Sequence, residues 1–476
     1  MCSGNGNICI WSLAGNAAVA ATIMVSSLAH FQQDVDPNSP DSDGRTPLSL
    51  AALRGREGVV QLLLRHRDVD CDSSDSNNRT PLSLAASSGC EGVVRSLLGC
   101  REVNPNSWDS SGRTPLSYAV TSEDEGVVKL FLEREDVNSD LSDSSGRTPL
   151  SYAASGGCEG VARLLLGRGD VNPNSLDSNG RLPLSYAAAG SHGGVVKLLV
   201  ESQDIDPNSS DSDGLTPLSY AAQWGRVDLV EGLLEHEGVV KLLLGRGDVS
   251  PNSLDSNGRP PLSYAAAGGH GGVVKLLVES PDIDLNSSDS DSLTPLLYAA
   301  QWGREDLVQR FLERKSVNPD ISDIRGRTPL SYAASRGHEG VMKLLLGHRD
   351  INPNLPDRNG LTPLSYAIIS RAGGVVELLE HGGVNPDLPD RDGRTPLLFA
   401  ALRGDEDAVK LLLGRVDFNP NSSDRDGLTP LSYAVLLEDA GVVKLLVERG
   451  SVNPDSPDSG GRTRLLSTTI SGAGGV

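Results

Sequence analysis

The stretch that decides the fold is residues 323–351, which read D-I-R-G-R-T-P-L-S-Y-A-A-S-R-G-H-E-G-V-M-K-L-L-L-G-H-R-D-I. Asp323 and Gly326 suit the first and fourth positions of a type I turn. Thr328 is a good helix N-cap, and Pro329 suits the first helical position, where no backbone N–H is needed. The stretch therefore predicts a turn that leads directly into a helix.

A short first helix should follow this turn. Leu330, Ala333 and Ala334 are spaced at i, i+3 and i+4, so they share one face of a helix. Gly337 is typical of the position just after a helix, because glycine adopts the left-handed conformation without strain. We therefore expect the first helix to end at Gly337.

A second helix is expected after the glycine. Val341, Leu344 and Leu345 should lie on one apolar face of it. The segment Asn352-Pro353-Asn354 cannot continue a helix, because proline lacks the N–H and restricts the preceding residue. Each unit is thus predicted as turn, helix, turn, helix and return loop.

This unit recurs along almost the whole chain. The triplet T-P-L or its relic recurs every 34 residues, except for a step of 44 after Thr216 and one of 33 after Thr362. This register defines twelve full units and a thirteenth that is cut short. The triplets begin at Thr46, Thr80, Thr114, Thr148, Leu182, Thr216, Pro260, Thr294, Thr328, Thr362, Thr395, Thr429 and Thr463.

A single unit of this kind cannot bury its apolar face, whereas stacked units can, which predicts a one-dimensional solenoid. One row of the stack is aromatic, because all nine tyrosines fall at the same repeat position. Leu50, Leu84 and Phe399 fill that position elsewhere, so we interpret the row as core packing rather than a stacking platform. The Arg that precedes T-P-L in nine units is interpreted as a ladder that pairs with the turn Asp.

The units resemble the ankyrin repeat, through the signature D-x-x-G-R-T-P-L-x-x-A-A-x-x-G-H-x-x-V-V-K-L-L-L in 143–166 and 323–346. The resemblance implies an all-α ankyrin-repeat solenoid, elongated and curved, with short β-turn fingers. The segments S-Y-A-A and E-G-V-V-K-L-L-L are similar to those of fungal ankyrin arrays, which often form the sensor end of NLR-like proteins. The chain departs from the family in carrying Ser after T-P-L, as at Ser331, and Gly in the first turn of the second helix, as at Gly340.

We expect three segments along the chain. Residues 1–40 contain a half repeat, residues 41–457 form the array of about twelve units, and residues 458–476 hold a truncated final repeat and tail. The unit 211–254 is irregular, because ten additional residues place a second-helix sequence twice within 226–248. We expect an extended or doubled second helix there, with recombination debris of no function as the alternative.

Composition limits the class of partner. The chain has 63 acidic and 42 basic residues, for a formal net charge of −21. Such a charge argues against a nucleic acid or an anionic membrane as the partner. No apolar run reaches the length of a membrane span, and the first basic residue is Arg45, which argues against a secretory signal. We expect an intracellular protein, cytoplasmic or nuclear.

No catalytic constellation is visible in the sequence. The phosphate-binding pattern G-x-x-x-x-G-K-[ST] does not occur, and no C-x-x-C pair suggests a zinc site. His236 and His338 each begin an H-E-x-x-H pattern, but Val240 and Met342 stand where its second His would be. We therefore expect no enzyme activity, no cofactor and no metal. The R-G-D tripeptides at 168–170 and 246–248 are interpreted as coincidences.

The resemblance implies that turn tips and first-helix faces line a concave groove that binds a partner. The second residue of the turn is Ser in the first eight units and then becomes Ile324, Arg358, Arg391 and Arg425, with Arg325, Arg336 and Arg403 nearby. This change predicts a basic patch for an acidic or phosphorylated partner, because Arg pairs bidentately with carboxylate and phosphate. The alternative is a solubilising face whose Arg residues balance neighbouring Asp residues.

Trp224 and Trp302 occupy variable first-helix positions and are candidate anchors for a partner. Residues 171–224 recur almost verbatim at 249–302, so the two tryptophans are copies of one feature. Packing against the adjacent unit is the alternative reading for both.

The sequence favours non-catalytic protein–protein recognition on the groove. A sensor fragment of a fungal NLR-like receptor and a regulatory or adaptor subunit of an enzyme are the alternatives. A degenerating gene copy is a further one.

Overall fold

The computed structural model describes residues 36–202, 205–224, 238–371, 378, 383–415, 419–448 and 452. Within these residues every regular element is a helix, and no strand occurs. The half repeat expected in 1–40, except for residues 36–40, the truncated repeat in 458–476 and most of the doubled helix in 226–248 lie outside the described residues.

The chain divides into two compact units. Unit 1 comprises Met1–Trp224 and Leu229–Ser250, and unit 2 comprises Gly225–Asp228 and Pro251–Val476. Each unit is a stack of repeats of the kind that the sequence predicts.

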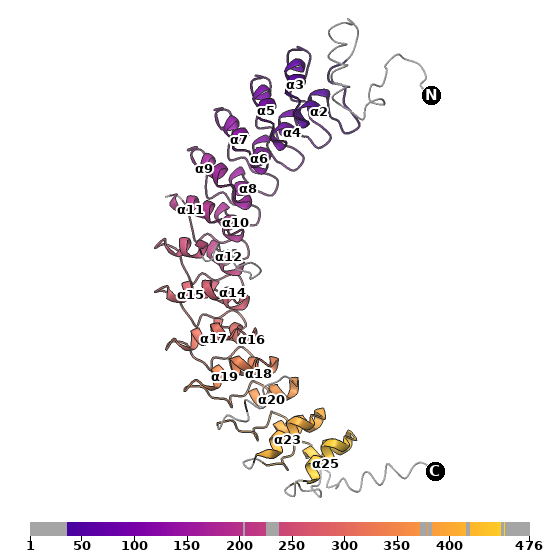
Figure 1. Ribbon diagram of the computed structural model, residues 1–476, viewed down its shortest axis with the longest axis vertical. Helices are drawn as coiled ribbons and strands as arrows, with labels where there is room; N and C mark the ends of the chain where they lie inside the picture. Colours follow the sequence, from indigo (N-terminus) through magenta and orange to yellow (C-terminus); the bar gives the residue numbers. More distant parts are fainter. Residues whose placement is uncertain are drawn as a thin grey trace, which may run out of the picture. The chain divides into compact units, whose positions relative to one another are not determined.

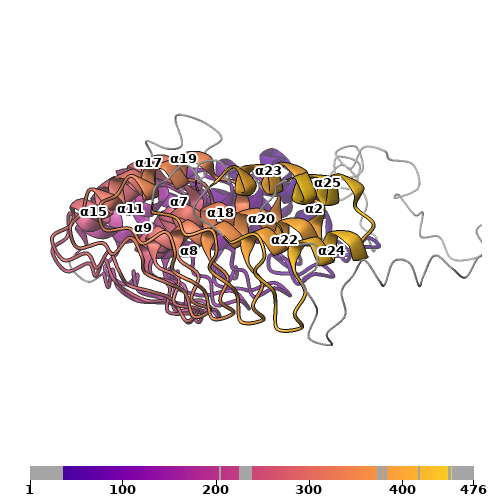
Figure 2. The same cartoon turned by 90° about the horizontal axis from the view of Figure 1, so that it is seen from below.

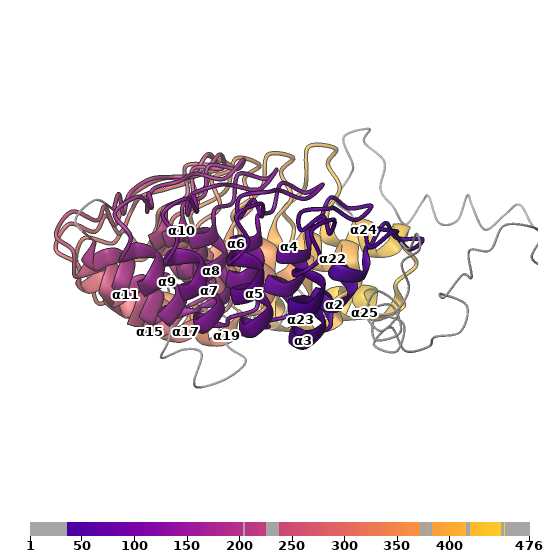
Figure 3. The ribbon, with the colours of Figure 1, turned by 90° about the horizontal axis from the view of Figure 1, so that it is seen from above.

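In unit 1 the first helices of successive repeats pack side by side, and each second helix packs on its own first helix and on the preceding second helix (Figures 1 and 3). The first helices are α2 (Pro47–Leu53), α4 (Pro81–Ser87), α6 (Pro115–Thr121), α8 (Pro149–Gly156), α10 (Pro183–Ala189) and α12 (Pro217–Gln223). The second helices are α3 (Glu57–Leu63), α5 (Glu91–Leu98), α7 (Glu125–Leu132), α9 (Glu159–Leu166) and α11 (Gly193–Glu201).

Unit 2 repeats this arrangement, with its turns extending together to one side of the first helices (Figure 2). Its first helices are α14 (Pro261–Gly268), α16 (Pro295–Gln301), α18 (Pro329–Arg336), α20 (Pro363–Ser370), α22 (Pro396–Arg403) and α24 (Pro430–Leu436). Its second helices are α15 (Gly271–Glu279), α17 (Glu305–Leu312), α19 (Glu339–Leu346), α23 (Glu406–Gly414) and α25 (Ala440–Glu448). The predicted all-α solenoid is confirmed.

The first helix begins and ends as its sequence predicts. Thr328 caps α18 by accepting a hydrogen bond from the backbone N–H of Ser331, with an N···O distance of 3.2 Å. The Ser331 hydroxyl also lies 3.1 Å from the Thr328 hydroxyl, and both residues are buried. The Ser that follows T-P-L, at which the chain departs from the ankyrin signature, thus satisfies the buried cap. Gly337 ends the helix in the left-handed region, with φ +71°.

The second helix differs in one detail from the predicted face. Val341 and Leu345 of α19 are fully buried, but Leu344 is only half-buried, and Met342 is fully buried in its place. Leu344 therefore lies at the edge of the buried face, and Met342 belongs to that face although the sequence did not predict it there. The reason is that α19 packs both on α18 and on the preceding second helix α17, so the buried arc is rotated away from the i, i+3, i+4 stripe.

The glycine in the first turn of the second helix lies beside the Glu that begins the preceding second helix. A Cβ atom built on Gly340 would lie 1.9 Å from a carboxylate oxygen of Glu305, which comes from the second helix of the preceding repeat. Gly160 meets Glu125 in the same way, at 1.6 Å. The missing side chain lets one helix place its acidic N-terminal residue against the next helix. Glycine at this position lowers the stability of the helix by up to about 1 kcal/mol relative to alanine.

The return loops are tied to one another by asparagine. The side-chain amide of Asn106 donates to the carbonyl of Asp136 at 2.7 Å, and its oxygen accepts from the N–H of Asn138 at 2.8 Å. One side chain thus satisfies both a donor and an acceptor in the next repeat. The same pair of bonds is made by Asn38, Asn208, Asn252 and Asn354.

Candidate recognition surface

The turns, which we call fingers, are joined to one another through their backbones. Within each unit, the N–H of the second residue in a finger donates to the carbonyl of the third residue in the preceding finger, as from Arg358 to Arg325 at 2.8 Å. Gly326, the fourth residue, has φ +83°, and a Cβ on it would approach the N atom of Arg358 to 3.0 Å. Glycine is needed here for both reasons. The fingertips are therefore held in a fixed register.

Each finger is held internally by its first residue. One carboxylate oxygen of Asp323 accepts from the N–H groups of Arg325 and Arg327, at 2.9 and 2.8 Å. The other oxygen accepts from the hydroxyl of Tyr332 on α18 at 2.8 Å. Tyr118, Tyr152, Tyr186, Tyr220, Tyr264, Tyr298, Tyr366 and Tyr433 make the same bond to the Asp nine residues earlier.

The tyrosine row is thus more than core packing. Its rings are buried or half-buried, and its hydroxyls tie each first helix to its own finger. Where Leu50, Leu84 or Phe399 replaces Tyr, the Arg before T-P-L donates its Nε–H to the same carboxylate, as Arg394 does to Asp390 at 3.0 Å. Every unit in which Leu precedes T-P-L retains its Tyr. This complementarity is legible in the sequence, and our sequence reading missed it.

The predicted Arg ladder is confirmed for five of its members, which pair with the Asp of their own finger: Arg45, Arg79, Arg147, Arg327 and Arg394. The others differ. Arg259 lies 3.9 Å from Asp289 of the next finger, and Arg113 donates to the hydroxyl of Thr121 at 2.9 Å. The guanidinium of Arg181 instead lies over the ring of Tyr186.

These contacts shift the titration of the groups involved. Burial raises the pKa of Tyr152 to about 12, and its hydrogen bond to the Asp143 carboxylate acts in the same direction. Burial would also raise the pKa of Asp143. The hydrogen bonds from Tyr152 and from the finger N–H groups outweigh that effect and hold its pKa below the ordinary value. We call these hydrogen bonds from the Tyr hydroxyl and the finger N–H groups to the finger Asp the finger clamp. The finger clamp favours an ionised Asp beside a neutral Tyr.

The second finger position forms an exposed row in unit 2. Ile324 is 44% exposed, and Arg358, Arg391 and Arg425 are exposed. Backbone bonds of 2.8–2.9 Å join these four fingers, so the side chains follow one another at regular intervals. In the described part of the chain, the three guanidinium groups make no ion pair and no side-chain hydrogen bond. We call Ile324, Arg358, Arg391 and Arg425 the fingertip row.

The ends of the first helices form a second row in unit 2. Arg336 and Arg403 are the last residues of α18 and α22, and both are exposed. Trp302 follows α16, is 50% exposed, and lies with its ring 5.4 Å from the Arg336 guanidinium carbon. We call Trp302, Arg336 and Arg403 the helix-end row. Trp224 is 47% exposed and lies in unit 1, so it belongs to neither row.

Arg371 is a residue that sequence reasoning missed. It occupies the position that Gly337 and Gly404 fill in other repeats, with φ +49°, and its guanidinium donates to the carbonyl of Arg403. A basic residue in a glycine position was the signal that could have found it. Arg325 completes the group as the third residue of its finger and is exposed.

Acidic residues interrupt the basic character of this surface. Asp392 and Asp426 directly follow Arg391 and Arg425, and both are exposed. Asp392 forms an ion pair with Arg394 rather than with Arg391. The fingertip arginines therefore stay available while part of the neighbouring acidic charge is engaged elsewhere.

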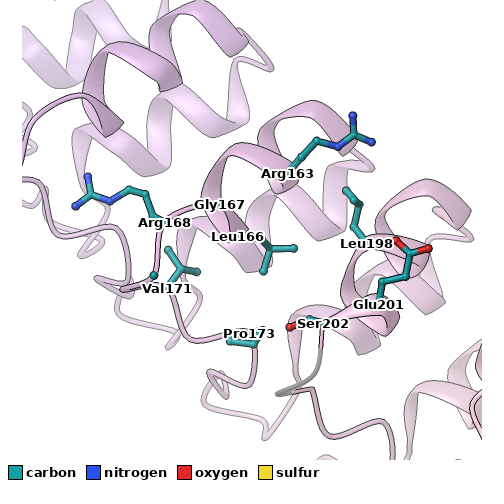
Figure 4. A pocket seen from close by; sticks show the side chains of 10 residues that line it. Arg163, Leu166, Gly167, Arg168, Val171, Pro173, Leu198, Glu201 and Ser202 are labelled. Carbon is teal, nitrogen blue, oxygen red and sulfur yellow. The ribbon is translucent and has the colours of Figure 1, made fainter.

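A pocket in unit 1 is a weaker candidate. It has a volume of about 400 Å³ and lies between the ends of α9 and α11, with Leu166, Val171 and Leu198 in its wall (Figure 4). Arg163 at its edge is paired with Glu159 at 2.6 Å. Ligand sites usually combine an apolar wall with converging polar groups, and here the nearby Arg is already engaged.

Arg168, beside this pocket, belongs to one of the two R-G-D tripeptides. Its guanidinium pairs with Asp170 at 3.0 Å and donates to the carbonyls of Leu132 and Arg134 in the preceding repeat. It thereby satisfies carbonyl groups that the end of α7 leaves free. Arg246 and Asp248 repeat the arrangement. The tripeptide is part of the contact between repeats, which explains its recurrence.

Comparison with known families agrees with this architecture. A family model described as ankyrin repeats, three copies, matches residues 15–109, 99–175, 169–239, 235–323, 305–390 and 371–458. The chain belongs to the ankyrin-repeat family, whose members generally serve as protein-interaction modules. A search of curated proteins found no significant match to the chain. Among the residues that the structure describes, no helix is both long and apolar enough to cross a membrane.

Proposed function

We propose that this protein is a non-catalytic recognition module whose unit 2 binds an acidic or phosphorylated segment of a protein partner. The binding surface would be the fingertip row together with the helix-end row. The observation that carries this proposal is the row of exposed Arg358, Arg391 and Arg425, held in register and without ion pairs in the described structure.

The finger geometry supports the proposal energetically. Because backbone bonds already hold the fingertips, a partner would not have to order them on binding, and this lowers the entropic cost of association. Guanidinium groups bind carboxylates and phosphates through two parallel hydrogen bonds. Trp302 beside Arg336 would add an apolar anchor, a residue type enriched at binding hot spots.

The alternative of a merely solubilising face is less well supported. A solubilising Arg should be balanced by the Asp next to it, yet Asp392 pairs with Arg394 instead.

We place the interaction inside the cell as part of the proposal. Cys71, Cys90, Cys100 and Cys158 are free, which fits a reducing compartment.

The proposal is tested by a charge-reversed variant in which both Arg358→Glu and Arg391→Glu are introduced. Neither change removes a finger hydrogen bond, because those bonds come from the backbone. Affinity capture from host-cell extract should recover a partner with the wild-type chain and lose it with this variant. Binding of the purified partner should weaken about tenfold or more, and its salt dependence should diminish.

The matched control carries Arg67→Glu and Arg349→Glu. These two side chains are 92% and 82% exposed, lie on return loops and belong to neither row. Their replacement changes the net charge equally and should leave the partner bound. Equal loss in both variants would point to bulk charge, and unchanged binding in the first would remove the proposed surface.

A further inference from the structure

We infer that the fingertip row binds an extended peptide in the polyproline II conformation, with an apolar residue followed by an acidic residue at every third position. This inference rests on the proposed function and specifies the partner segment. It follows from three observations: the spacing of the fingertips, the order of residues along the row, and the same order along the helix-end row.

The spacing of the row follows from the first helices that the fingers precede. These helices pack on one another in sequence, α16 on α18, α18 on α20, α20 on α22 and α22 on α24. Backbone bonds keep each finger in register with the preceding one, as from Arg358 to Arg325. Packed helices lie roughly 8–10 Å apart, so successive members of the row should be separated by about the same distance.

Only some peptide conformations match this spacing. A β-strand turns every second side chain to the same face, so its contacts would recur every 6.8 Å or so, which falls short by about 2 Å at each finger. A polyproline II helix has about three residues per turn and rises about 3.1 Å per residue, so every third side chain returns to one face after about 9.3 Å. The fingertip row thus favours a period of three.

The order of residues gives the peptide a direction. The fingertip row begins with the exposed Ile324 and continues with three arginines. The helix-end row begins with Trp302 and continues with Arg336 and Arg403, with the exposed Ser370 at the end of α20 between these two arginines. Both rows are apolar at the end nearer α16 and basic beyond it. A complementary peptide would place an apolar side chain at that end and carboxylates or phosphates at the following contacts.

Fluorescence anisotropy with the full chain and labelled peptides tests the inference. The matching peptide is L-P-P-E-P-P-E-P-P-E, and its reverse, E-P-P-E-P-P-E-P-P-L, covers the opposite chain direction. The control L-P-E-P-E-P-E-P-P-P has the same composition with acidic residues at every second position. One of the period-three peptides should bind about tenfold tighter than the control, because it alone pairs with all three arginines.

Two further arms sharpen the result. Replacing the prolines of the better peptide with glycine should weaken binding, because a flexible chain must be ordered on the surface. The Ile324→Asp variant should weaken the peptide that carries Leu more than one in which Leu is replaced by Glu. Phosphoserine in place of Glu distinguishes phosphate from carboxylate as the preferred anion.

The outcomes separate this inference from the proposed function. Equal binding of period-three and period-two peptides, both lost in the variant with Arg358→Glu and Arg391→Glu, would overturn the register and leave an acidic-segment surface. No binding of any acidic peptide to a well-folded chain would overturn both.

Discussion

At the scale of single residues, the finger Asp organises the surface. Its carboxylate joins two backbone N–H groups to the hydroxyl of a Tyr on the following helix, or to an Arg where that Tyr is missing. A buried carboxylate without such donors is costly, because it loses its hydration and gains nothing in return. The alternation of Tyr and Arg keeps a donor on this carboxylate throughout the described fingers.

The importance of this donor can be tested with two tyrosines. Tyr366→Phe should destabilise its finger by about 1–3 kcal/mol, because Leu361 stands where other fingers have Arg and Asp357 would lose the one side-chain donor that the described residues give it. Tyr332→Phe should cost less, about 0.5–1.5 kcal/mol, because Arg327 still pairs with Asp323. Hydrogen exchange of the finger N–H groups measures both effects.

Rescue provides the control for this pair. Adding Leu361→Arg to Tyr366→Phe should restore protection toward the wild-type level, as Arg394 does beside Phe399. Equal losses of protection at the two fingers, or no recovery with Leu361→Arg, would contradict this role of the Tyr or Arg donor in the finger clamp.

At the scale of elements, caps and return loops fix how one repeat meets the next. Thr caps begin most of the first helices, as Thr328 does for α18, and glycine lets Glu305 lie against α19. The Asn side chains join successive loops by two hydrogen bonds each. Asp replaces Asn at some of these loop positions and can supply only the acceptor. At Asp72 and Asp320, one buried carboxylate oxygen has no donor in the described structure.

Asp72→Asn and Asp320→Asn should therefore stabilise the array. Burial raises the pKa of both groups above the ordinary value, and the charge of Asp70 adds to the effect at Asp72. Because the folded pKa is raised, protonation of each Asp favours the folded state. This contribution to stability is fully present below the unfolded pKa of about 3.9 and is lost as pH rises through the folded pKa. The gain from Asn should be about 1 kcal/mol per site near pH 7 and should shrink on acidification.

Thermal melts of the full chain, from below the unfolded pKa of about 3.9 up to pH 7, measure this gain in stability. Asp407→Asn is the matched control, since its side chain is 92% exposed and the same charge is removed. A gain that persists at low pH, or an equal gain in the control, would mean that net charge is responsible.

At the scale of the whole molecule, the contacts are local along the chain. Helices pack within a repeat and against the neighbouring repeat, and the described residues fall into two compact units. The stability of such an array is approximately a sum over repeats and their interfaces. The basic fingertip row lies within unit 2, in a chain whose formal net charge is −21.

Unfolding of the full chain should therefore take place in more than one step. Differential scanning calorimetry should give a calorimetric enthalpy clearly larger than the van't Hoff enthalpy, because a single two-state transition requires the two to be equal. Hydrogen exchange should then assign the steps to the two units. One transition with equal enthalpies would show that the array unfolds as a single cooperative body.

The sequence by itself determined the repeat boundaries, the two helices of each unit, their Thr caps and terminal glycines, and the ankyrin family. These features depend on residues within three or four positions of one another, or on a period that is visible without coordinates. The exposed Arg residues of the fingers were also predicted, because the fingertip position does not take part in the core.

Only the tertiary structure decided how side chains are shared between elements. The bond from Tyr332 to Asp323, the position of Glu305 against Gly340, and the burial of Met342 in place of Leu344 depend on where a neighbouring helix or repeat lies. The register of the fingertip row has the same origin, since each fingertip is positioned by the preceding finger. Periodicity specifies which residues face inward, whereas packing between repeats specifies what each of them meets.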